Sequence, residues 1–263
     1  MINYLIIGGR SYLASEFKRY LNEKEISFHS LNQESSNNYS ETNLRDVLRD
    51  KKPENIIDFK FPLVSSNDKD FEKINIKTAL NPQINLINSL KNIQIQPKKL
   101  ILVSSEKVKE QNSIYSKLKK DQENLYKKNI TQNKKLQIIR LDSVFGPGDE
   151  SKYRLIPYFF NKIIKQNKID INIDPNMYGK FIYIEDALNR IHGAFKDLDS
   201  NNLIFKTTFI HLIMAFSYIL KNIHNFENTV VCNGEVINCT NEIQDEKFFN
   251  YLVKTTEWYW DNF

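Results

Sequence analysis

Two side chains four positions apart, Tyr115 and Lys119, form the pattern with the clearest chemical meaning. Because positions i and i+4 of a helix lie on the same face, the Lys119 ammonium can approach the Tyr115 phenol. A nearby positive charge lowers a phenol pKa that is ordinarily about 10, so Tyr115 could exchange a proton near neutral pH. Ser104 and Ser105 precede this pair at the end of a predicted strand, where a hydroxyl could hydrogen-bond the same substrate oxygen. The alternative is an ordinary helix surface, on which this spacing recurs by chance.

A second candidate site is a glycine turn near the start of the chain. It follows the apolar run 4–7 and opens a predicted helix. A dinucleotide site needs a tight turn, close approach of the backbone to the pyrophosphate, and a helix N-terminus that offers N–H groups. The alternative is a plain strand-to-helix turn, because serine and alanine replace the second and third glycines of the usual pattern. The segment consists of Gly8, Gly9, Arg10, Ser11, Tyr12, Leu13 and Ala14.

Strands that alternate with helices must position these residues. Apolar runs predict strands at 4–7, 26–31, 56–59, 100–103 and 136–139, and helical spacing predicts helices at 12–21, 44–48, 80–90 and 115–128. This alternation predicts an α/β fold with a doubly wound parallel sheet and right-handed crossovers.

The alternation of predicted strands and helices becomes less regular after Gly146-Pro147-Gly148, which we take as the domain boundary. We expect a dinucleotide-binding domain at 1–145, to which 181–195 returns, and a mainly substrate-binding domain at 146–263. Beyond the boundary we expect helices at 156–164, 185–195 and 209–223 and a strand at 181–184.

Composition excludes several classes of protein. The 263 residues carry 37 basic and 32 acidic side chains, a net charge of +5 that forms no dense basic arm, so we expect no nucleic-acid partner. The longest apolar stretch, 209–220, is shorter than the roughly twenty residues of a membrane span. Cys232 and Cys239 match no metal spacing and the four histidines are scattered, so we expect no metal site and a reducing cytoplasm.

Five segments in order resemble the extended short-chain dehydrogenase/reductases of the NAD-dependent epimerase/dehydratase family. The resemblance implies a modified Rossmann fold with a small C-terminal substrate-binding domain. The segments are the glycine turn, Leu102-Val-Ser-Ser105, Tyr115-x-x-x-Lys119, Arg140-Leu-Asp-Ser-Val-Phe-Gly-Pro-Gly-Asp149 and Phe181-Ile-Tyr-Ile-Glu-Asp186.

The resemblance also implies a role for each matching position. Ser105, Tyr115 and Lys119 match the catalytic Ser/Thr, Tyr and Lys, and Gly8 to Ala14 match the pyrophosphate loop. Further cofactor-binding residues that it implies are Phe59, Lys60, Phe61, Val103 and Leu141. The substrate-binding candidates are Ser104, Ser105, Glu106 and Ser143.

The end of the second strand bears on the choice of cofactor. NAD-selective members usually carry an acid there, which binds the ribose 2′-OH and repels a 2′-phosphate. Here Asn32 occupies the region and no carboxylate occurs before Glu34, while Arg10 stands where the resembling fucose-type reductases carry an arginine. We therefore expect NADP(H) to be preferred, with NAD(H) possible.

Among family members, the chain most resembles abequose synthase and GDP-fucose synthase, which reduce the 4-keto group of a nucleotide deoxysugar. The resemblance implies NADPH-dependent 4-keto reduction in deoxysugar biosynthesis for O-antigen or lipopolysaccharide, by a cytoplasmic homodimer without a membrane partner. One alternative is a nucleotide-sugar 4-epimerase with bound NAD. An alternative of another class is a dinucleotide-binding regulator without catalysis.

Overall fold

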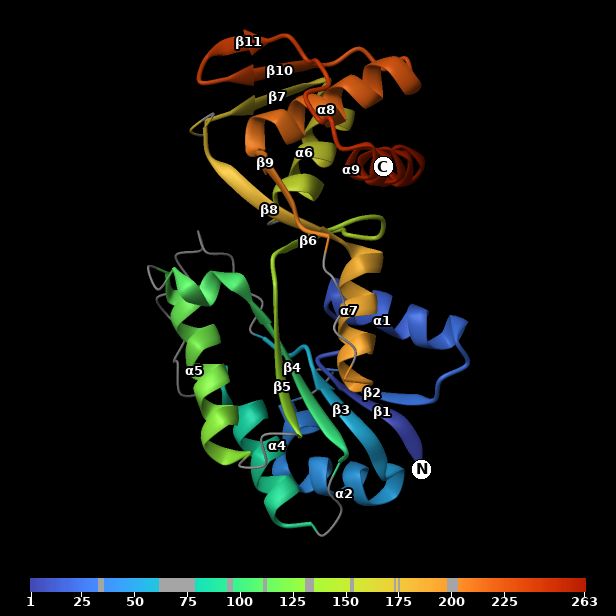
Figure 1. Ribbon diagram of the computed structural model, residues 1–263, viewed down its shortest axis with the longest axis vertical. Coiled ribbons are helices and arrows are strands. Elements are labelled where there is room, and N and C mark those ends of the chain that lie inside the picture. The colour runs from blue at the N-terminus through green and yellow to red at the C-terminus, as the bar shows by residue number, and fades with distance from the viewer. Residues whose placement is uncertain are drawn as a thin grey trace. The chain divides into compact units, whose positions relative to one another are not determined.

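The computed structural model describes residues 1–32, 36–61, 79–93, 97–110, 113–130, 135–151, 154–172, 174, 176–197 and 203–263. The chain forms two compact units, one of Met1–Leu141 with Leu188–Asn201, and one of Asp142–Ala187 with Asn202–Phe263 (Figure 1). Helix α7 (Ile184–Phe195) begins in the second unit and ends in the first.

The first unit is built on a five-stranded parallel sheet in the order β2-β1-β3-β4-β5. This is one of the two common doubly wound orders, and its direction reverses between β1 and β3. The predicted α/β fold with a doubly wound parallel sheet is therefore confirmed. The strands are β1 (Ile2–Ile7), β2 (Phe28–Leu31), β3 (Pro53–Asp58), β4 (Lys99–Ser105) and β5 (Leu136–Leu141).

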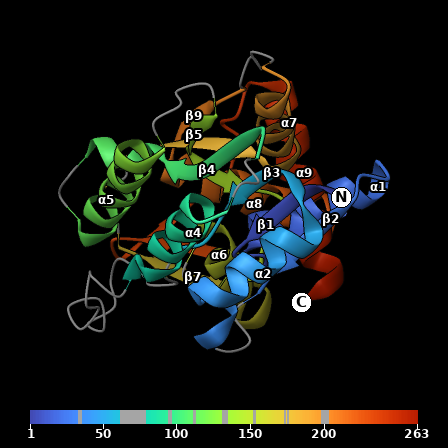
Figure 2. The same cartoon turned by 90° about the horizontal axis from the view of Figure 1, so that it is seen from below.

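Helices cover both faces of this sheet, as the nearly continuous apolar runs of its strands require. On one face, α1 (Tyr12–Glu23) and the end of α7 contribute Phe17 and Phe195, whose rings pack against Tyr4. The other face bears α2 (Glu41–Lys51), α4 (Asn81–Lys91) and α5 (Ile114–Asn129), whose apolar side chains form one core with the strands (Figure 2). Two short 3₁₀ helices, η1 (Ser36–Tyr39) and η3 (Glu106–Lys109), lie in the connections.

The second unit contains two small sheets, in the orders β6-β8-β9 and β11-β10-β7. Aromatic side chains fill its interior: the Tyr183 ring stacks on Tyr251, and the Phe205 ring stacks on Phe248. Its elements are β6 (Ser143–Phe145), α6 (Leu155–Gln166), β7 (Lys168–Ile171), β8 (Tyr178–Tyr183), β9 (Phe205–Thr208), α8 (Phe209–Ile223), β10 (Thr229–Cys232), β11 (Glu235–Ile237) and α9 (Glu246–Asn262).

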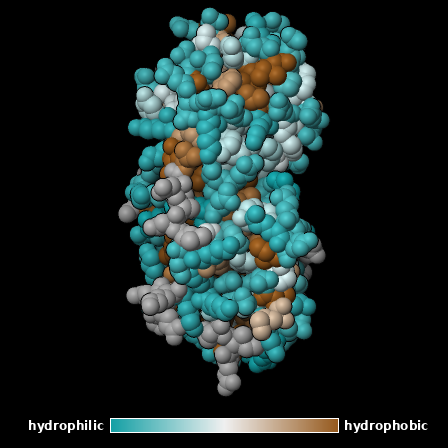
Figure 3. All heavy atoms as spheres, turned by 45° about the vertical axis from the view of Figure 1, so that its right-hand side comes forward, coloured by the Kyte–Doolittle hydropathy of each residue, from teal (hydrophilic) through white to brown (hydrophobic). Residues whose placement is uncertain are grey.

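Hydrophilic residues cover most of the face that Figure 3 presents, with small hydrophobic patches between them. In the part of the chain that the structure describes, no helix combines the length and the apolar character that crossing a bilayer demands.

Candidate active site

The glycine turn lies at the carboxyl end of β1, where the strand order reverses. Gly8 has a φ of +80°, a left-handed conformation that glycine adopts without strain. The N–H groups of Gly8 and Gly9 both lie 3.2 Å from the carbonyl oxygen of Leu31, and the Gly8 N–H also lies 3.1 Å from the Tyr39 hydroxyl. The Ser11 hydroxyl accepts the Ala14 N–H and caps α1, so the turn leads directly into a helix N-terminus.

Two neighbouring strand ends confine this turn. A Cβ atom at Gly8 would lie 2.6 Å from the backbone nitrogen of Lys60, which follows β3. A Cβ atom at Gly9 would lie 2.5 Å from Oδ1 of Asn32, which follows β2. Position 8 requires glycine, because its neighbour there is backbone, whereas at position 9 the Ser30 and Asn32 side chains would have to move to admit a Cβ atom. Ligands of doubly wound sheets bind at this switch point. The turn therefore fits the backbone approach that a dinucleotide pyrophosphate requires.

Positive charge gathers beside the turn. The Lys60 ammonium lies 5.7 Å from the centre of the Tyr39 ring. Burial raises the pKa of Tyr39 to about 12, against the opposing effects of the Gly8 hydrogen bond and the Arg10 charge. Arg10 is exposed on the turn itself. Gln33 and Glu34, which bear on the predicted cofactor preference, lie outside the described residues.

The end of β4 directs two adjacent serines differently. The Ser104 hydroxyl is buried and donates to Oε1 of Glu123 at 2.8 Å. The Ser105 hydroxyl accepts the Lys107 N–H at 3.2 Å and caps η3. Ser105 is therefore the strand-end hydroxyl directed away from the Glu123 contact.

Helix α5 carries Tyr115 and Lys119 on one face, as the spacing predicts. Lys119 is only 5% exposed, and its Nζ atom donates to the carbonyl of Val103 at 3.1 Å and to Oε1 of Gln122 at 3.3 Å. Burial lowers the pKa of Lys119 to about 8, against the opposing charges of Asp58 and Glu123. Lys119 thus holds its proton at neutral pH by a narrow margin.

One aromatic ring contacts both of these side chains. The centre of the Phe61 ring lies 4.2 Å from Nζ of Lys119 and 5.0 Å from the centre of the Tyr115 ring. Phe61 belongs to the segment that follows β3. The structure therefore places this segment, which holds predicted cofactor-binding residues, in contact with Tyr115 and Lys119 of α5. Phe59, in the same segment, packs against Phe17.

An ion pair between the buried Glu123 carboxylate and the partly exposed Arg140 side chain anchors α5 to β5. Arg140 donates two hydrogen bonds to Glu123, from Nε at 2.8 Å and from Nη2 at 2.7 Å. Burial opposes ionisation of Glu123, but the hydrogen bonds from Arg140 and Ser104 outweigh it and lower the pKa of the carboxyl. Glu123 therefore holds α5 against both β4 and β5.

Sequence reasoning missed the carboxylate of Asp58, at the end of β3. This side chain is 0% exposed and accepts three hydrogen bonds. The only signal in the sequence was a single acid inside the apolar run 56–59, which predicted a strand and nothing else. Its partners Gln83 and Tyr126 come from α4 and α5, at distances along the chain that no local pattern encodes.

The remaining predicted residues lie at strand ends. Leu141 ends β5 and is paired in register with Ser105, while Ser143 begins β6 in the second unit with its side chain exposed. The Glu106 carboxylate pairs with Lys109 within η3.

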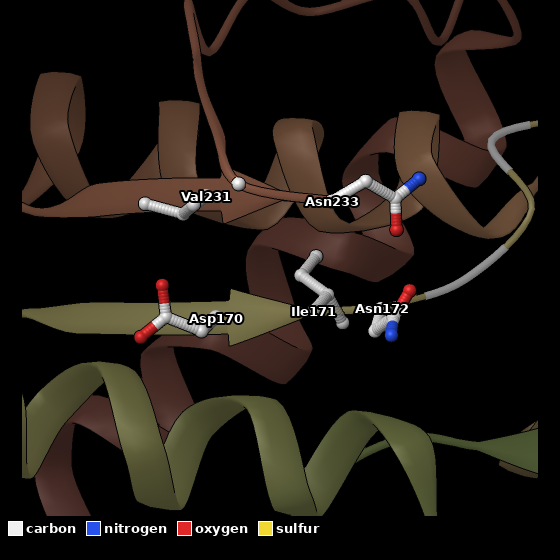
Figure 4. A pocket seen from close by; sticks show the side chains of 6 residues that line it. Asp170, Ile171, Asn172, Val231 and Asn233 are labelled. Carbon is white, nitrogen blue, oxygen red and sulfur yellow. The ribbon is translucent and has the colours of Figure 1, made fainter.

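A separate hollow lies in the second unit, at the ends of the parallel strands β7 and β10 (Figure 4). Asp170, Asn172 and Asn233 supply its polar side chains, and none of the predicted site residues lines it. Across the described ranges, no cluster of three or more His, Cys, Asp or Glu side chains could hold a metal ion.

The sheet order, with a glycine turn at its switch point and helices on both faces, defines the class of doubly wound α/β proteins. Within that class, the chain belongs to the NAD-dependent epimerase/dehydratase family of enzymes, whose sequence model matches residues 4–204. The family resemblance read from the sequence is thereby confirmed. No curated protein sequence matches the chain.

Solved structures of similar fold span nearly the whole chain. A UDP-glucose 4-epimerase with UDP-glucose from Thermotoga maritima has a TM-score of 0.74 at 14% identity, covering 99% of both chains. A dTDP-glucose 4,6-dehydratase from Bacillus anthracis in complex with NAD has a TM-score of 0.73 at 16% identity, covering 100% of this chain and 97% of that one. A GDP-L-fucose synthetase from Naegleria fowleri has a TM-score of 0.71 at 13% identity, covering 99% and 94%. At such identities these likenesses concern the fold alone.

Proposed function

We propose that this protein is an NADPH-dependent reductase that acts on the 4-keto group of a nucleotide-activated deoxysugar. The observation that carries the proposal is the arrangement at the end of β4. Tyr115 and the buried cation Lys119 contact the same Phe61 ring, and Lys119 hydrogen-bonds the strand that ends in Ser105. A proton donor, a neighbouring cation and a strand-end hydroxyl are the groups that carbonyl reduction requires.

The dinucleotide would be held along the switch point of the sheet. The segment 8–13 would receive the pyrophosphate, because its backbone is tightly turned and its helix N-terminus favours negative charge. When bound, the reduced nicotinamide supplies the hydride that the reaction consumes. The other side chains assigned to the cofactor are Asn32, Phe59, Lys60, Phe61, Val103, Tyr115, Lys119 and Leu141.

The chain's own residues would supply the proton and stabilise the negative charge that develops on the carbonyl oxygen. Tyr115 donates its phenolic proton to the carbonyl oxygen as that oxygen becomes an alkoxide. Ser105 donates a hydrogen bond to the same oxygen, and the Lys119 cation favours the phenolate that Tyr115 leaves behind. Lys119 must be protonated to do this, so activity should fall as pH rises through its folded pKa of about 8.

Two cations near the turn support the preference for NADPH. Arg10 lies on the turn and Lys60 lies against it, while Asn32 at the end of β2 is uncharged. A guanidinium can make a charge-assisted, often bidentate contact with a 2′-phosphate. NADPH should therefore bind more tightly than NADH.

The fold likeness extends to a UDP-glucose 4-epimerase, a dTDP-glucose 4,6-dehydratase and a GDP-L-fucose synthetase, which supports a nucleotide sugar as the substrate class. We assign the sugar to the substrate-binding domain at 146–263, with Ser105, Glu106 and Ser143 as candidate contacts. The Ser104 hydroxyl is buried and donates to Glu123, so we no longer assign it to the substrate. A homodimeric, cytoplasmic enzyme of surface-polysaccharide biosynthesis fits this assignment.

The second candidate function is nucleotide-sugar 4-epimerisation with bound NAD. Its support is the matching fold of the Thermotoga maritima UDP-glucose 4-epimerase over 99% of both chains. An epimerase would purify with NAD and turn over without added cofactor, whereas the proposed reductase must consume one NADPH for each sugar.

The experiment is a panel of 4-keto nucleotide deoxysugars carrying CDP, dTDP, GDP or UDP, assayed by NADPH absorbance. We expect oxidation of NADPH with at least one of them. Binding of NADPH without oxidation by any sugar would instead favour the dinucleotide-binding regulator.

A further inference from the structure

The end of β3 buries a carboxylate in the middle of the sheet. In register, Asp58 lies beside Ile7 of β1 and Leu102 of β4, so it stands where the glycine turn and the end of β4 flank β3. Its side chain is 0% exposed. A charge in such a place is unfavourable unless hydrogen bonds and an opposite charge compensate it.

Three hydrogen-bond donors converge on the two carboxylate oxygens. The backbone N–H of Lys60 donates to Oδ1 at 2.7 Å, and the Tyr126 hydroxyl and Nε2 of Gln83 donate to Oδ2 at 2.7 Å and 3.2 Å. The backbone N–H and the amide NH₂ can only donate, so these two contacts favour the ionised carboxylate. The Tyr126 hydroxyl could also accept a hydrogen bond from the protonated acid. The pKa of Asp58 is raised, because burial outweighs the lowering effects of these donors and of the Lys119 charge.

Lys119 is the buried cation that compensates the negative charge of Asp58. Its own hydrogen-bond acceptors, the Val103 carbonyl and the Gln122 amide, are neutral. Of the two acids that act on Lys119, Glu123 already receives two hydrogen bonds from Arg140. Asp58 also acts on the Lys60 ammonium, which lies over the Tyr39 ring.

The same network fixes the segment that leaves β3. Nε2 of Gln83 and Nε2 of Gln122 both donate to the carbonyl of Lys60, at 3.1 Å and 2.9 Å. The backbone of Lys60 is therefore held at its N–H by Asp58 and at its carbonyl by α4 and α5. The next residue is Phe61, whose ring contacts Lys119.

We propose that Asp58 is a positioning residue: its buried carboxylate keeps the Lys119 ammonium charged and holds the β3 exit against α5. The proposal rests on the proposed function only where it concerns catalysis, since a charged Lys119 is the form that favours the Tyr115 phenolate. The electrostatic coupling between Asp58 and Lys119 belongs to the protein without any ligand, and it is tested in that form.

The groups that face the pair come from four elements. The negative charges of Asp58 on β3 and of Glu123 on its own helix act on Lys119. Glu123 is in turn paired with Arg140 of β5, and its Oε2 atom lies 3.6 Å from Nζ of Lys127. Asp58 faces Tyr126 of α5 and Gln83 of α4. Asp58 also raises the pKa of Lys60, which burial lowers.

The test is a titration of the lysine side chains by NMR, with lysine labelled with carbon-13 at Cε. The Lys119 and Lys60 signals are assigned from Lys119→Met and Lys60→Met. Removing the negative charge in Asp58→Asn should lower the midpoint of Lys119 by about one pH unit or more. Tyr126→Phe is the matched control, because it removes a hydrogen bond from the same carboxylate but keeps the charge, and it should move that midpoint far less.

If Asp58→Asn does not fold, a reciprocal measurement tests the coupling between Asp58 and Lys119. Coupling between two sites is mutual, so Lys119→Met must raise the midpoint of the Asp58 carboxyl, followed by carbon-13 at Cγ of aspartate. The proposal would be overturned if the titration midpoint of Lys119 were the same in the natural protein and in Asp58→Asn. It would also be overturned if Lys119→Met left the midpoint of the Asp58 carboxyl unchanged. Coupling without oxidation of NADPH on any sugar would instead contradict the proposed function and leave the role of Asp58 standing.

Discussion

The Nζ atom of Lys119 donates a hydrogen bond to the backbone carbonyl of Val103, at 3.1 Å. This contact joins α5 to β4 within a few residues of Ser105, the residue at which β4 ends. A cation buried against a neutral carbonyl keeps its proton less firmly than one in water, and burial lowers the pKa of Lys119 to about 8.

The stability of the protein should rise between pH 8 and about 10. The folded pKa of Lys119, about 8, is below its ordinary value of 10.5, so in this interval the unfolded chain holds a proton that the folded chain has released. The free energy of unfolding then increases with pH, by up to about 1.4 kcal/mol per pH unit for one such group. Above pH 10 the trend should reverse, because burial raises the pKa of Tyr4 and Tyr39 to about 12.

Urea denaturation across this range measures the effect. In Lys119→Met most of the rise should disappear, and Lys60, whose pKa burial also lowers, should supply the remainder. The same slope in both proteins would show that Lys119 does not titrate as described.

Gly8→Ala should destabilise the protein more than Gly234→Ala. Both glycines have a positive φ, +80° and +89°, so alanine meets a similar backbone strain at either position. At Gly8 the new Cβ would also lie 2.6 Å from the Lys60 backbone, whereas nothing described lies within 4 Å at Gly234. The extra loss should be at least about 1 kcal/mol in the free energy of unfolding, because two backbones must separate. Equal losses in thermal or urea unfolding would contradict the close approach of β1 and β3.

Arg10→Ala should abolish the preference for NADPH over NADH. Its guanidinium is the charged side chain on the turn, and a 2′-phosphate is the only difference between the two cofactors. The measurement is the ratio of kcat/KM for NADPH and NADH in both proteins. Arg19→Ala, which removes another exposed arginine from α1, should leave the ratio unchanged. Equal or NADH-favouring values in the natural protein would move the assignment toward the epimerase.

The protein should not dehydrate a nucleotide hexose. The 4,6-dehydratases that the chain resembles carry Asp-Glu directly after the strand-end Ser/Thr, whereas Glu106 and Lys107 stand here. An ammonium cannot replace a carboxylate as the base that removes a proton. Mass spectrometry of a reaction with dTDP-glucose or GDP-mannose and added NAD should show unchanged sugar, and a 4-keto-6-deoxy product would refute this reasoning.

Much of the first unit could be predicted from local patterns. The apolar runs gave all five strands of the large sheet, and helical spacing located α1, α2, α4 and α5, because buried parallel strands and amphipathic helices have distinct periods. The apolar helix expected at 209–223 coincides with α8 (Phe209–Ile223). The strand expected at 181–184 is instead β8, Tyr178–Tyr183, and Ile184 already begins α7.

The short strands of the second unit could not be found in this way. β6, β7, β9, β10 and β11 have three or four residues each, fewer than a period-two pattern needs to stand out. Pairing between strands distant in sequence decides where they form; β7, for example, pairs with β10.

Some residues of the candidate site could likewise be predicted from the sequence, and others could not. Tyr115, Lys119 and Ser105 could be named because their spacing and their place after a strand have a direct chemical meaning. Asp58 could not, because its role depends on Gln83 and Tyr126, which reach it from two helices. Burial of a single polar residue is a property of the folded chain, and an isolated acid in an apolar run does not disclose it.

The central claim is tested most directly by comparing the natural protein with Tyr115→Phe in the NADPH-dependent reduction of a 4-keto nucleotide deoxysugar. The substitution removes the proposed proton donor and keeps the ring that packs against Phe61, so the fold should be unchanged by circular dichroism and thermal unfolding. We predict that kcat falls by about 10² to 10⁴-fold, the usual contribution of a general acid. Near-normal turnover in Tyr115→Phe would contradict the account.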